Sequence, residues 1–380
     1  MRALKRIKLP TGLCDEFGIV AEQRDILSQQ LLAAFRHKGY TRIATPLLEQ
    51  EKLFQNYELK DQMYKFTDAD GRSLVLRPDL TLPIARFLAN NNVSLPRKFY
   101  YLGEKFSIGQ QFMGQRNELT QAGVELVGFN SIKAEIECLL IIHWINRQFL
   151  NNQLTIELGD AQLVTKVLSN LNISATKQAA IATALFAKNF PRYQELIKGF
   201  ITNPLYPFLK KWPRLFGSVE GIEDELADVQ LPSLAKPIVA NLLKLAKFVQ
   251  HNFADQQVII DLSSAVPQKY YTGVIFKAYM AQINNYVISG GRYDQLLANF
   301  QQKSEAAVGL GINIDLLTKL SNPPLAEKNK LVFAPLQAYP TALKLVNEND
   351  NYSLALADNL AGAKQEAATA GMDLITIGGE

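Results

Sequence analysis

The sequence predicts an α+β fold, in which an antiparallel sheet is flanked by helices. Three observations lead to this prediction. Strand patterns occur early and late in the chain, and they follow one another as hairpins more often than as strand–helix–strand units. Helical patterns border them, and a long helix-rich stretch separates the early strands from the late ones. Strands and helices segregated in this way are typical of α+β proteins and argue against a doubly wound parallel sheet.

The first part of the chain combines one helix with short strands. A helix is predicted over about 15–36, because apolar residues such as Leu27 and Leu31 fall near one face and Gly39 follows its end. The strand patterns that follow cover residues 39–46, 64–66, 73–76 and 98–106. The first ends at Pro46, as strands at sheet edges often do. Asp68-Ala69-Asp70-Gly71 predicts a hairpin turn between the second and third.

The middle of the chain is dominated by helices. A helix over 131–149 and a strand over 155–158 precede a proline-interrupted, aliphatic stretch at about 160–250, which we interpret as a helical insertion. Further elements are predicted as strands over 258–262, 273–279 and 286–288 and as a helix over 313–320.

The end of the chain predicts a small α/β tail. Ser321-Asn322-Pro323-Pro324 reads as a linker, and strand patterns alternate with helical ones after it. We therefore expect a core domain at 1–320, which includes the insertion, and a separate tail domain at 325–380. The strands of the tail are predicted at residues 331–334, 352–356 and 374–377.

Composition excludes several classes of protein. The formal charge is +4 over 380 residues, and the basic residues are scattered, so no nucleic-acid footprint stands out. Cys14 and Cys138 are far apart, which favours a reducing cytoplasm over a disulfide framework. The three histidines are equally dispersed, so neither a metal site nor a cofactor is expected. No apolar run is long enough to span a membrane.

The strand pattern at 119–128 carries the most information about function. Gln121, Gly123 and Glu125 point to one face, while the alternate residues form an apolar face that suits a core. An amide and a carboxylate on either side of a glycine leave room for a small ligand, and they suit an ammonium or imidazole group. A solvated strand face with a glycine bulge is the alternative.

Three other segments carry candidate residues. Asp79 and Thr81 present a carboxylate and a hydroxyl in one short segment, although Asp79 also suits the cap of a helix that begins near Leu82. In Lys269-Tyr270-Tyr271-Thr272-Gly273 a phenol above the glycine could close a pocket. Ser289-Gly290-Gly291-Arg292-Tyr293-Asp294 lacks the lysine and helix start of a phosphate loop, so we predict a tight turn for close packing or ligand approach.

Taken in order, these segments resemble the class II aminoacyl-tRNA synthetases, and among them histidyl-tRNA synthetase. The resemblance runs from about Pro10 to Leu317. Residues 39–46 resemble the dimer-forming first motif and 99–128 the second, and 307–312 resemble the start of the third. The tyrosine pair and the glycine-rich segment resemble two signatures that are specific to histidine.

The resemblance implies a binding site for histidine. The six residues it assigns to that site are Asp79, Thr81, Gln121, Glu125, Tyr271 and Tyr293. Asp79 stands where a glutamate is usual and keeps its charge. Asp79, Thr81 and Gln121 suit the α-ammonium group, while Glu125 and a tyrosine suit the imidazole.

The catalytic residues of that family do not carry over. Its second-motif arginine corresponds to Ser107, its histidine-specific arginine to Val266, and its third-motif arginine to Leu316, which follows Asp315. Neutral residues also stand at other positions of the second motif, namely Gly109, Gln115 and Asn117. Losing one preorganised contact to a developing anion costs about 3–4 kcal/mol, so no catalytic residue and no synthetase activity are expected.

The pattern resembles the synthetase-like paralogues that serve as regulatory subunits of ATP phosphoribosyltransferase in the first step of histidine biosynthesis. It implies a homodimer within a hetero-oligomer that contains a short-form catalytic subunit, with histidine as feedback effector and without tRNA or membrane. The tail is a departure, since such subunits often end near the third motif. Two alternatives stay open: a divergent ligase that activates histidine or another small acid, and a tRNA-binding pseudo-synthetase.

Overall fold

The computed structural model describes residues 7–109, 116–264, 268–283, 285–301, 303–321 and 329–378. The chain separates into two compact units. The larger contains Met1–Phe17 and Arg24–Asn322, and the smaller contains Gly18–Gln23 and Pro323–Glu380. In the part of the chain that is described, no helix is long and apolar enough to cross a membrane.

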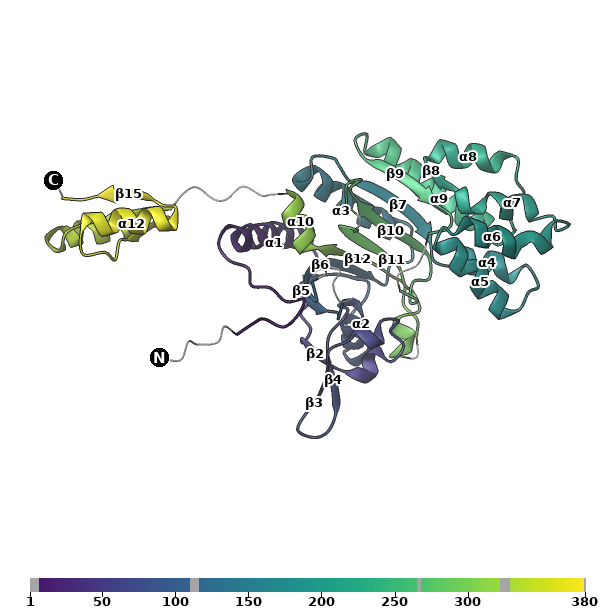
Figure 1. Cartoon of the computed structure of the whole chain (residues 1–380), viewed down its shortest axis with the longest axis horizontal. Coiled ribbons are helices and arrows are strands. Elements are labelled where there is room, and N and C mark those ends of the chain that lie inside the picture. Colours follow the sequence, from purple (N-terminus) through teal and green to yellow (C-terminus); the bar gives the residue numbers. More distant parts are fainter. Residues whose placement is uncertain are drawn as a thin grey trace. The chain divides into compact units, whose positions relative to one another are not determined.

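The larger unit is built on one mixed sheet that is mostly antiparallel (Figure 1). The pairs β1–β5 and β7–β9 are parallel, and the other neighbours are antiparallel. This confirms the predicted fold class. Within the described residues the spatial order is β1 (Thr41–Arg42), β5 (Arg97–Phe106), β6 (Glu118–Val127), β12 (Ala307–Asn313), β11 (Ile288–Arg292), β10 (Val274–Tyr279), β7 (Thr155–Asp160), β9 (Gln257–Asp261) and β8 (Phe216–Gly217).

One face of this sheet packs against helices. The helices are α1 (Ile19–His37), α3 (Lys133–Phe149) and α10 (Ile314–Ser321). Ala122, Val124 and Leu126 of β6 are buried in the same core as the apolar residues of α1 and α3, which confirms the predicted packed face of this strand. Period-two alternation therefore directs the opposite residues of β6 to the other face of the sheet.

The other face is covered by a second, smaller core. Helix α2 (Thr81–Asn90) packs there with Phe99 and Tyr101 of β5 and with aromatic residues of the following loops. A three-stranded antiparallel sheet extends from this core, in the order β2 (Leu48–Gln50), β4 (Ser73–Leu76) and β3 (Lys65–Thr67), with 3₁₀ turns η1 (Glu51–Phe54) and η2 (Lys60–Gln62). A further 3₁₀ turn, η5 (Leu297–Asn299), belongs to the same core.

The predicted insertion is helical, and it is not an isolated body. It contains α4 (Leu163–Ser169), α5 (Ala175–Phe186), α6 (Phe190–Ile197), η3 (Lys198–Phe200), α7 (Tyr206–Lys211), η4 (Trp212–Arg214), α8 (Val219–Ala227) and α9 (Lys236–Asn252). These helices gather at the end of the sheet formed by β7, β9 and β8 (Figure 1). The insertion also supplies the edge strand β8, and its apolar residues join the main core.

The smaller unit has its own parallel sheet in the order β14 (Tyr352–Leu354), β13 (Lys330–Phe333) and β15 (Asp373–Thr376). Its other elements are η6 (Leu336–Ala338), α11 (Tyr339–Asn347) and α12 (Leu360–Ala370). Successive residues of β13 point to opposite faces, so Leu331 and Val332 enter two separate small apolar clusters. Gly371 ends α12 in the left-handed conformation, as glycine does at many helix ends.

Several predicted boundaries differ from the structure. The strand predicted over 39–46 is reduced to Thr41–Arg42, although it does form the sheet edge. The strand predicted over 286–288 begins at Ile288 and continues through Gly290 and Gly291 to Arg292, so these glycines lie in a strand and not in a turn. The hairpin turn at 68–71 is confirmed, since the Asp68 side chain accepts from the backbone of Asp70 and Arg72.

Candidate functional site

The six residues assigned to a histidine site meet in one cavity of about 170 Å³, on the face of the main sheet that the smaller core covers. We call this cavity the polar pocket. Its size is below the range of about 300–1,000 Å³ found for drug-sized ligands, so it suits a smaller molecule. The lining residues are Tyr57, Asp79, Thr81, Tyr101, Lys105, Gln121, Glu125, Gln268, Tyr270, Tyr271, Ser289, Tyr293, Gly309, Leu310 and Gly311.

The floor of the pocket is made by β6 and by glycines of the neighbouring strand β12. Gly309 pairs with Glu125, and a methyl group on Gly309 would lie 1.7 Å from its Oε2 atom. A methyl group on Gly311 would lie 2.4 Å from Nε2 of Gln121. Because real side chains do not approach so closely, the two glycines create the space that the amide and the carboxylate occupy.

Gly123 has a different role from the one predicted. It leaves no room for a ligand, because the Tyr101 ring of the paired strand β5 fills the space above it. A methyl group on Gly123 would lie 2.3 Å from the phenol oxygen of Tyr101. That oxygen accepts a hydrogen bond of 2.8 Å from Nε2 of Gln121. The glycine therefore seats a tyrosine, and the tyrosine orients the amide of the pocket.

Glu125 is the most deeply buried acid of the pocket, at 2% exposure. The Thr81 hydroxyl donates to its Oε1 atom at 2.8 Å, and the Tyr293 hydroxyl donates to Oε2. Burial raises the pKa of Glu125 to about 8; the two hydroxyl donors oppose this shift, and the charge of Asp79 adds to it. A carboxyl group held in this way gains from a cationic partner or from a strong N–H donor.

Asp79 both caps a helix and faces the pocket. Its Oδ1 atom accepts from the backbone N–H of Leu82 at 2.8 Å, in the first turn of α2, and its Oδ2 atom accepts from Tyr270 at 3.4 Å. The predicted helix cap is therefore confirmed, and Asp79 also lines the pocket, while its part in binding a ligand stays a prediction. Thr81 is the first residue of α2 and not part of an extended segment, yet its side chain still reaches Glu125. Burial raises the pKa of Asp79.

Three tyrosines form the aromatic wall of the pocket. The rings of Tyr270 and Tyr271 lie 4.9 Å apart, and Tyr270 meets Tyr293 edge to face at 5.9 Å. The prediction that a phenol lies above Gly273 is wrong, because the space at Gly273 is taken by the Arg292 side chain. The ring of Tyr271 lies instead against Gly291 of β11, where a methyl group would be 3.0 Å from it.

The glycine-rich strand β11 is a packing device. A methyl group on Gly290 would lie 2.1 Å from the carbonyl oxygen of Gly309 on the neighbouring strand. The arginine that follows is engaged in a bidentate ion pair with the buried Glu135 of α3, at 2.6 and 2.7 Å. Arg292 also contacts Asp294 at 3.1 Å. This cation ties β11 to α3, so it is not available to a phosphate.

Neutral residues occupy the positions that the sequence resemblance assigns to the arginines of synthetases. Ser107 follows β5 and donates to the side chain of Gln62 at 3.3 Å, while Leu316 of α10 packs against the main core. The Asn117 amide instead holds the backbone of Thr11 and of Gly109. Gln115 and Val266 lie outside the described residues.

Arg116, just before β6, and Arg24 of α1 are both paired with acids. Arg116 contacts Glu16 at 2.5 Å and Asp315 at 3.7 Å. Arg24 contacts the same two acids, at 2.6 and 3.9 Å. Asp315 in addition accepts from the backbone of Thr120 at 2.8 Å. Their charges are thus balanced within the chain.

Sequence reasoning missed one charged residue of the pocket, Lys105. It also missed Tyr57, Tyr101, Gln268 and Ser289, which line the same cavity. The signal for Lys105 was present, because Tyr101, Gly103 and Lys105 alternate onto one face of the predicted strand. That this face is shared with Gln121 and Glu125 depends on the pairing of β5 with β6, which the sequence does not give.

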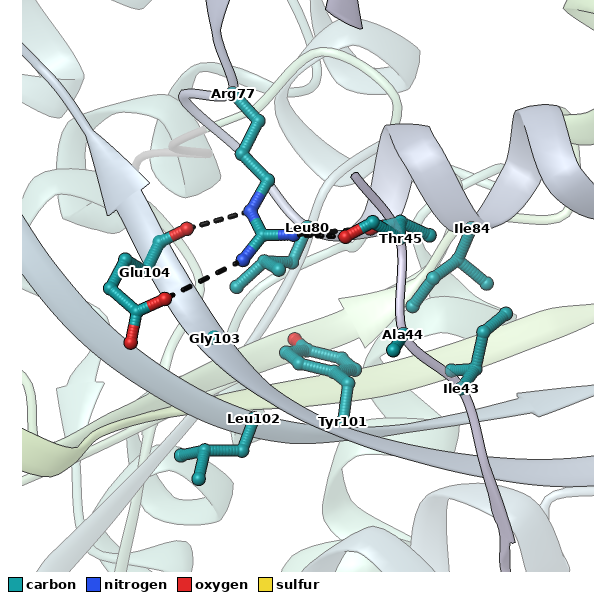
Figure 2. A pocket seen from close by; sticks show the side chains of 10 residues that line it. All are labelled: Ile43, Ala44, Thr45, Arg77, Leu80, Ile84, Tyr101, Leu102, Gly103 and Glu104. Carbon is teal, nitrogen blue, oxygen red and sulfur yellow. Dashed lines mark hydrogen bonds and ion pairs between the residues drawn. The ribbon is translucent and has the colours of Figure 1, made fainter. Parts of the chain in front are cut away.

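A second cavity, of about 140 Å³, lies at the edge of the sheet beside β1, and we call it the edge cavity (Figure 2). Its cation is Arg77, which is 5% exposed. The guanidinium donates to the backbone oxygens of Glu104 at 2.7 Å and of Thr45 at 2.6 Å, and Gly103 makes room for it. Figure 2 shows Arg77 stretched between Glu104 and Thr45, so it joins the segment that follows β1 to β5.

The described residues contain no group of three or more histidine, cysteine, aspartate or glutamate side chains that could hold a metal ion. Cys14 is exposed and Cys138 is buried in α3, and both are free. The polar pocket thus offers hydrogen bonds, charge and aromatic surface, which are the means of binding a small polar molecule.

Comparison with known proteins agrees with the geometry. The family model of histidyl-tRNA synthetase matches residues 18–317. A crystal structure from Bacillus halodurans, described as an ATP phosphoribosyltransferase regulatory subunit/histidyl-tRNA synthetase, superposes with a TM-score of 0.84 at 26% identity and covers 98% of both chains. Histidyl-tRNA synthetase from Nostoc sp. PCC 7120 shares the fold, with a TM-score of 0.79 at 20% identity over 97% of this chain and 90% of its own.

Two curated relatives are much closer in sequence. Both are ATP phosphoribosyltransferase regulatory subunits. The one from Limosilactobacillus fermentum is 46% identical over 97% of this chain and 96% of its own, and the one from Lactiplantibacillus plantarum is 44% identical over 98% and 97%. The match includes the tail, so the expectation that the tail departs from such subunits is wrong. This chain belongs to the family of ATP phosphoribosyltransferase regulatory subunits.

Proposed function

We propose that this chain is the regulatory subunit of an ATP phosphoribosyltransferase in the first step of histidine biosynthesis, and that it binds free histidine in the polar pocket. The observation that carries the proposal is the meeting of six side chains in one cavity of about 170 Å³ in a chain 46% identical to such a subunit. The chain would act in the cytoplasm, as a homodimer within a hetero-oligomer.

The chemistry of the pocket supports histidine as the ligand. Asp79, Thr81 and Gln121 offer a carboxylate, a hydroxyl and an amide oxygen to an α-ammonium group. Glu125 and Tyr293 are already joined by a hydrogen bond and face the position that an imidazole would take. The aromatic rings of the wall suit a flat, polar heterocycle, because they provide a large contact area and leave the heterocycle free to form hydrogen bonds with the floor.

Regulation follows from differential binding. Histidine can inhibit a complex only if it binds the inactive assembly more tightly than the active one. The polar pocket lies between the main sheet and the core around α2, so a bound ligand would contact both of them. The catalytic residues for phosphoribosyl transfer would belong to a short-form catalytic subunit.

A reconstitution experiment tests the regulatory role. The chain would be mixed with a short-form ATP phosphoribosyltransferase catalytic subunit, and pyrophosphate release would be followed with and without histidine. We expect activity that neither protein has alone and that histidine suppresses. Absence of activity, or activity that histidine leaves unchanged, would contradict the assembly role or the feedback role respectively.

Calorimetry tests the ligand assignment directly. Histidine should bind the isolated chain, and Gln121→Ala should weaken that binding at least tenfold, because removing one partner leaves a polar ligand group unpaired. The exposed Glu195→Ala variant is the control and should bind like the wild type. Equal affinities in all three proteins would place histidine elsewhere.

The remaining enzyme hypothesis, a divergent ligase, has a simple readout. Such a ligase would exchange pyrophosphate with ATP in the presence of histidine. The neutral Ser107 and Leu316, and the acid-paired Arg116, argue that exchange will be absent.

We further propose that residues 1–320 form the synthetase-like core and that 325–380 are a shortened relative of an anticodon-binding domain.

A further inference from the structure

The polar pocket contains a cation, Lys105, that forms no hydrogen bond and no ion pair with the described part of the chain. It is the one cationic side chain among the lining residues that the structure describes, where Asp79 and Glu125 are the acids. A half-buried ammonium group without a hydrogen-bonding partner gains from a ligand that supplies an anionic acceptor.

The position of Lys105 in the sheet gives the pocket a direction. Lys105 pairs with Leu119, which lies beyond Gln121 on β6, whereas Glu125 lies at the other end of the same strand face. Since residues directly opposite one another point to the same face of a sheet, the lysine enters from the end opposite Glu125. The polar groups along the floor therefore run from acid to amide to cation.

Asp79 is the acid whose charge acts on Lys105, but the two side chains form no ion pair. The Asp79 carboxylate raises the lysine pKa, but burial has the larger effect and lowers it. Both oxygens of Asp79 already accept hydrogen bonds, from Leu82 and Tyr270. Arg292 and Arg116, in contrast, form ion pairs with acids, Arg292 with Glu135 and Arg116 with Glu16.

We propose that Lys105 binds the α-carboxylate of the amino acid, so that the ligand lies along β6 with its carboxylate near Lys105 and its side chain near Glu125. This inference rests on the proposed function, because it takes a free amino acid as the ligand. It makes Lys105 the residue by which the pocket selects a zwitterionic amino acid over the corresponding amine.

The test compares histidine with histamine, which has the same imidazole and ammonium groups and lacks the carboxylate. In calorimetry of the full chain, the wild type should bind histidine at least about thirtyfold more tightly than histamine, since truncating one side of a buried charge pair has effects of this size or larger. Lys105→Met should lose most of its histidine affinity and keep its histamine affinity, so that the preference falls to a few-fold.

The outcomes separate this inference from the proposed function. If the wild type binds no histidine, the proposed ligand fails. If it binds histidine and histamine equally, Lys105 does not hold the carboxylate, and no variant is needed to conclude this. If Lys105→Met folds and keeps the preference, or weakens both ligands equally, the inference is overturned. Lys105→Gln serves as a second neutral variant should the methionine variant fail to fold.

Discussion

Glu125 combines three properties that decide how the polar pocket behaves. It is 2% exposed, it accepts from two hydroxyls, and it faces glycine on the neighbouring strand. Two hydroxyl donors favour the charged form, but burial and the nearby Asp79 oppose it. The carboxyl group is consequently protonated up to about pH 8, and it can ionise when a cationic group enters.

This protonation predicts a pH dependence of stability. The pKa of Glu125 rises from about 4.3 in the unfolded chain to about 8 in the folded one. Its contribution to stability is therefore fully present below pH 4.3 and is lost as the pH rises towards 8. Without ligand, the free energy of unfolding of the wild type should fall relative to that of Glu125→Gln, by at most about 1.4 kcal/mol per pH unit. Urea unfolding of both proteins at about pH 5, 6.5 and 8 measures this difference in the free energy of unfolding.

Parallel stability curves for the wild type and Glu125→Gln over this range would show that Glu125 is ionised in the free protein. The comparison uses a difference between two proteins, so titration of Asp79 and of other groups cancels to first order.

The glycine opposite Glu125 gives a second prediction. Gly309→Ala should abolish histidine binding and destabilise the chain by about 1–3 kcal/mol, because the new methyl group would displace the Glu125 carboxylate. Gly199→Ala is the matched control, since its methyl group meets nothing closer than Lys177 Nζ at 3.8 Å. Thermal unfolding and calorimetry measure both effects. A Gly309→Ala protein that binds histidine normally would contradict the described floor of the pocket.

Individual pocket residues could largely be predicted from the sequence, and their neighbours could not. Gln121 and Glu125 follow from alternation along one strand and from the order of the motifs. Gly123 was misjudged, because the residue that fills its space, Tyr101, comes from a different strand. Which side chains of two strands meet depends on their register, and a single sequence does not specify it.

At the scale of elements, the ion pair between Glu135 of α3 and Arg292 of β11 is a buried interaction that links the helix to the sheet. Glu135 and Arg292 have side-chain exposures of 4% and 12%. Glu135→Gln should lower the free energy of unfolding by about 3 kcal/mol, because it leaves a buried guanidinium without its full counter-charge. Glu195→Gln, in an exposed pair with Arg192, should change it by less than about 1 kcal/mol. Chemical denaturation measures both, and similar losses in the two variants would contradict the structural role.

Element prediction failed where close packing overrides intrinsic preference. Glycine disfavours strands, so Gly290 and Gly291 were assigned to a turn after the strand. In the structure they lie inside β11, because only glycine allows the backbone of β12 to approach so closely. The short strand β2 was missed for a related reason, since its pairing with β4 compensates for a weak local pattern.

At the scale of the whole molecule, the fold class was predictable and the connection of its parts was not. Hairpin signals gave the antiparallel sheet, and aliphatic periodicity gave the helical insertion. The sequence did not reveal that the insertion contributes the edge strand β8 or that its apolar residues join the main core. Such long-range pairing is set by tertiary contacts and not by local pattern.

The two compact units predict independent behaviour of the tail. Every described lining residue of the polar pocket belongs to the larger unit, and the smaller unit has apolar clusters of its own. A variant that ends after Ser321 should therefore bind histidine with an affinity within about threefold of the full chain. Calorimetry on both proteins measures this. A loss of binding in a truncated protein that is still folded would show that the smaller unit supports the pocket.

Tyr101 is a partition shared by both cavities. One side of its ring borders the edge cavity with Arg77, while its hydroxyl holds Gln121 in the polar pocket. Neither compartment can be reshaped without touching this wall. A smaller residue in place of Tyr101 would enlarge the edge cavity and would also remove the hydroxyl that holds the Gln121 amide. The packing beside β1 and the selectivity of the polar pocket therefore have to be redesigned together.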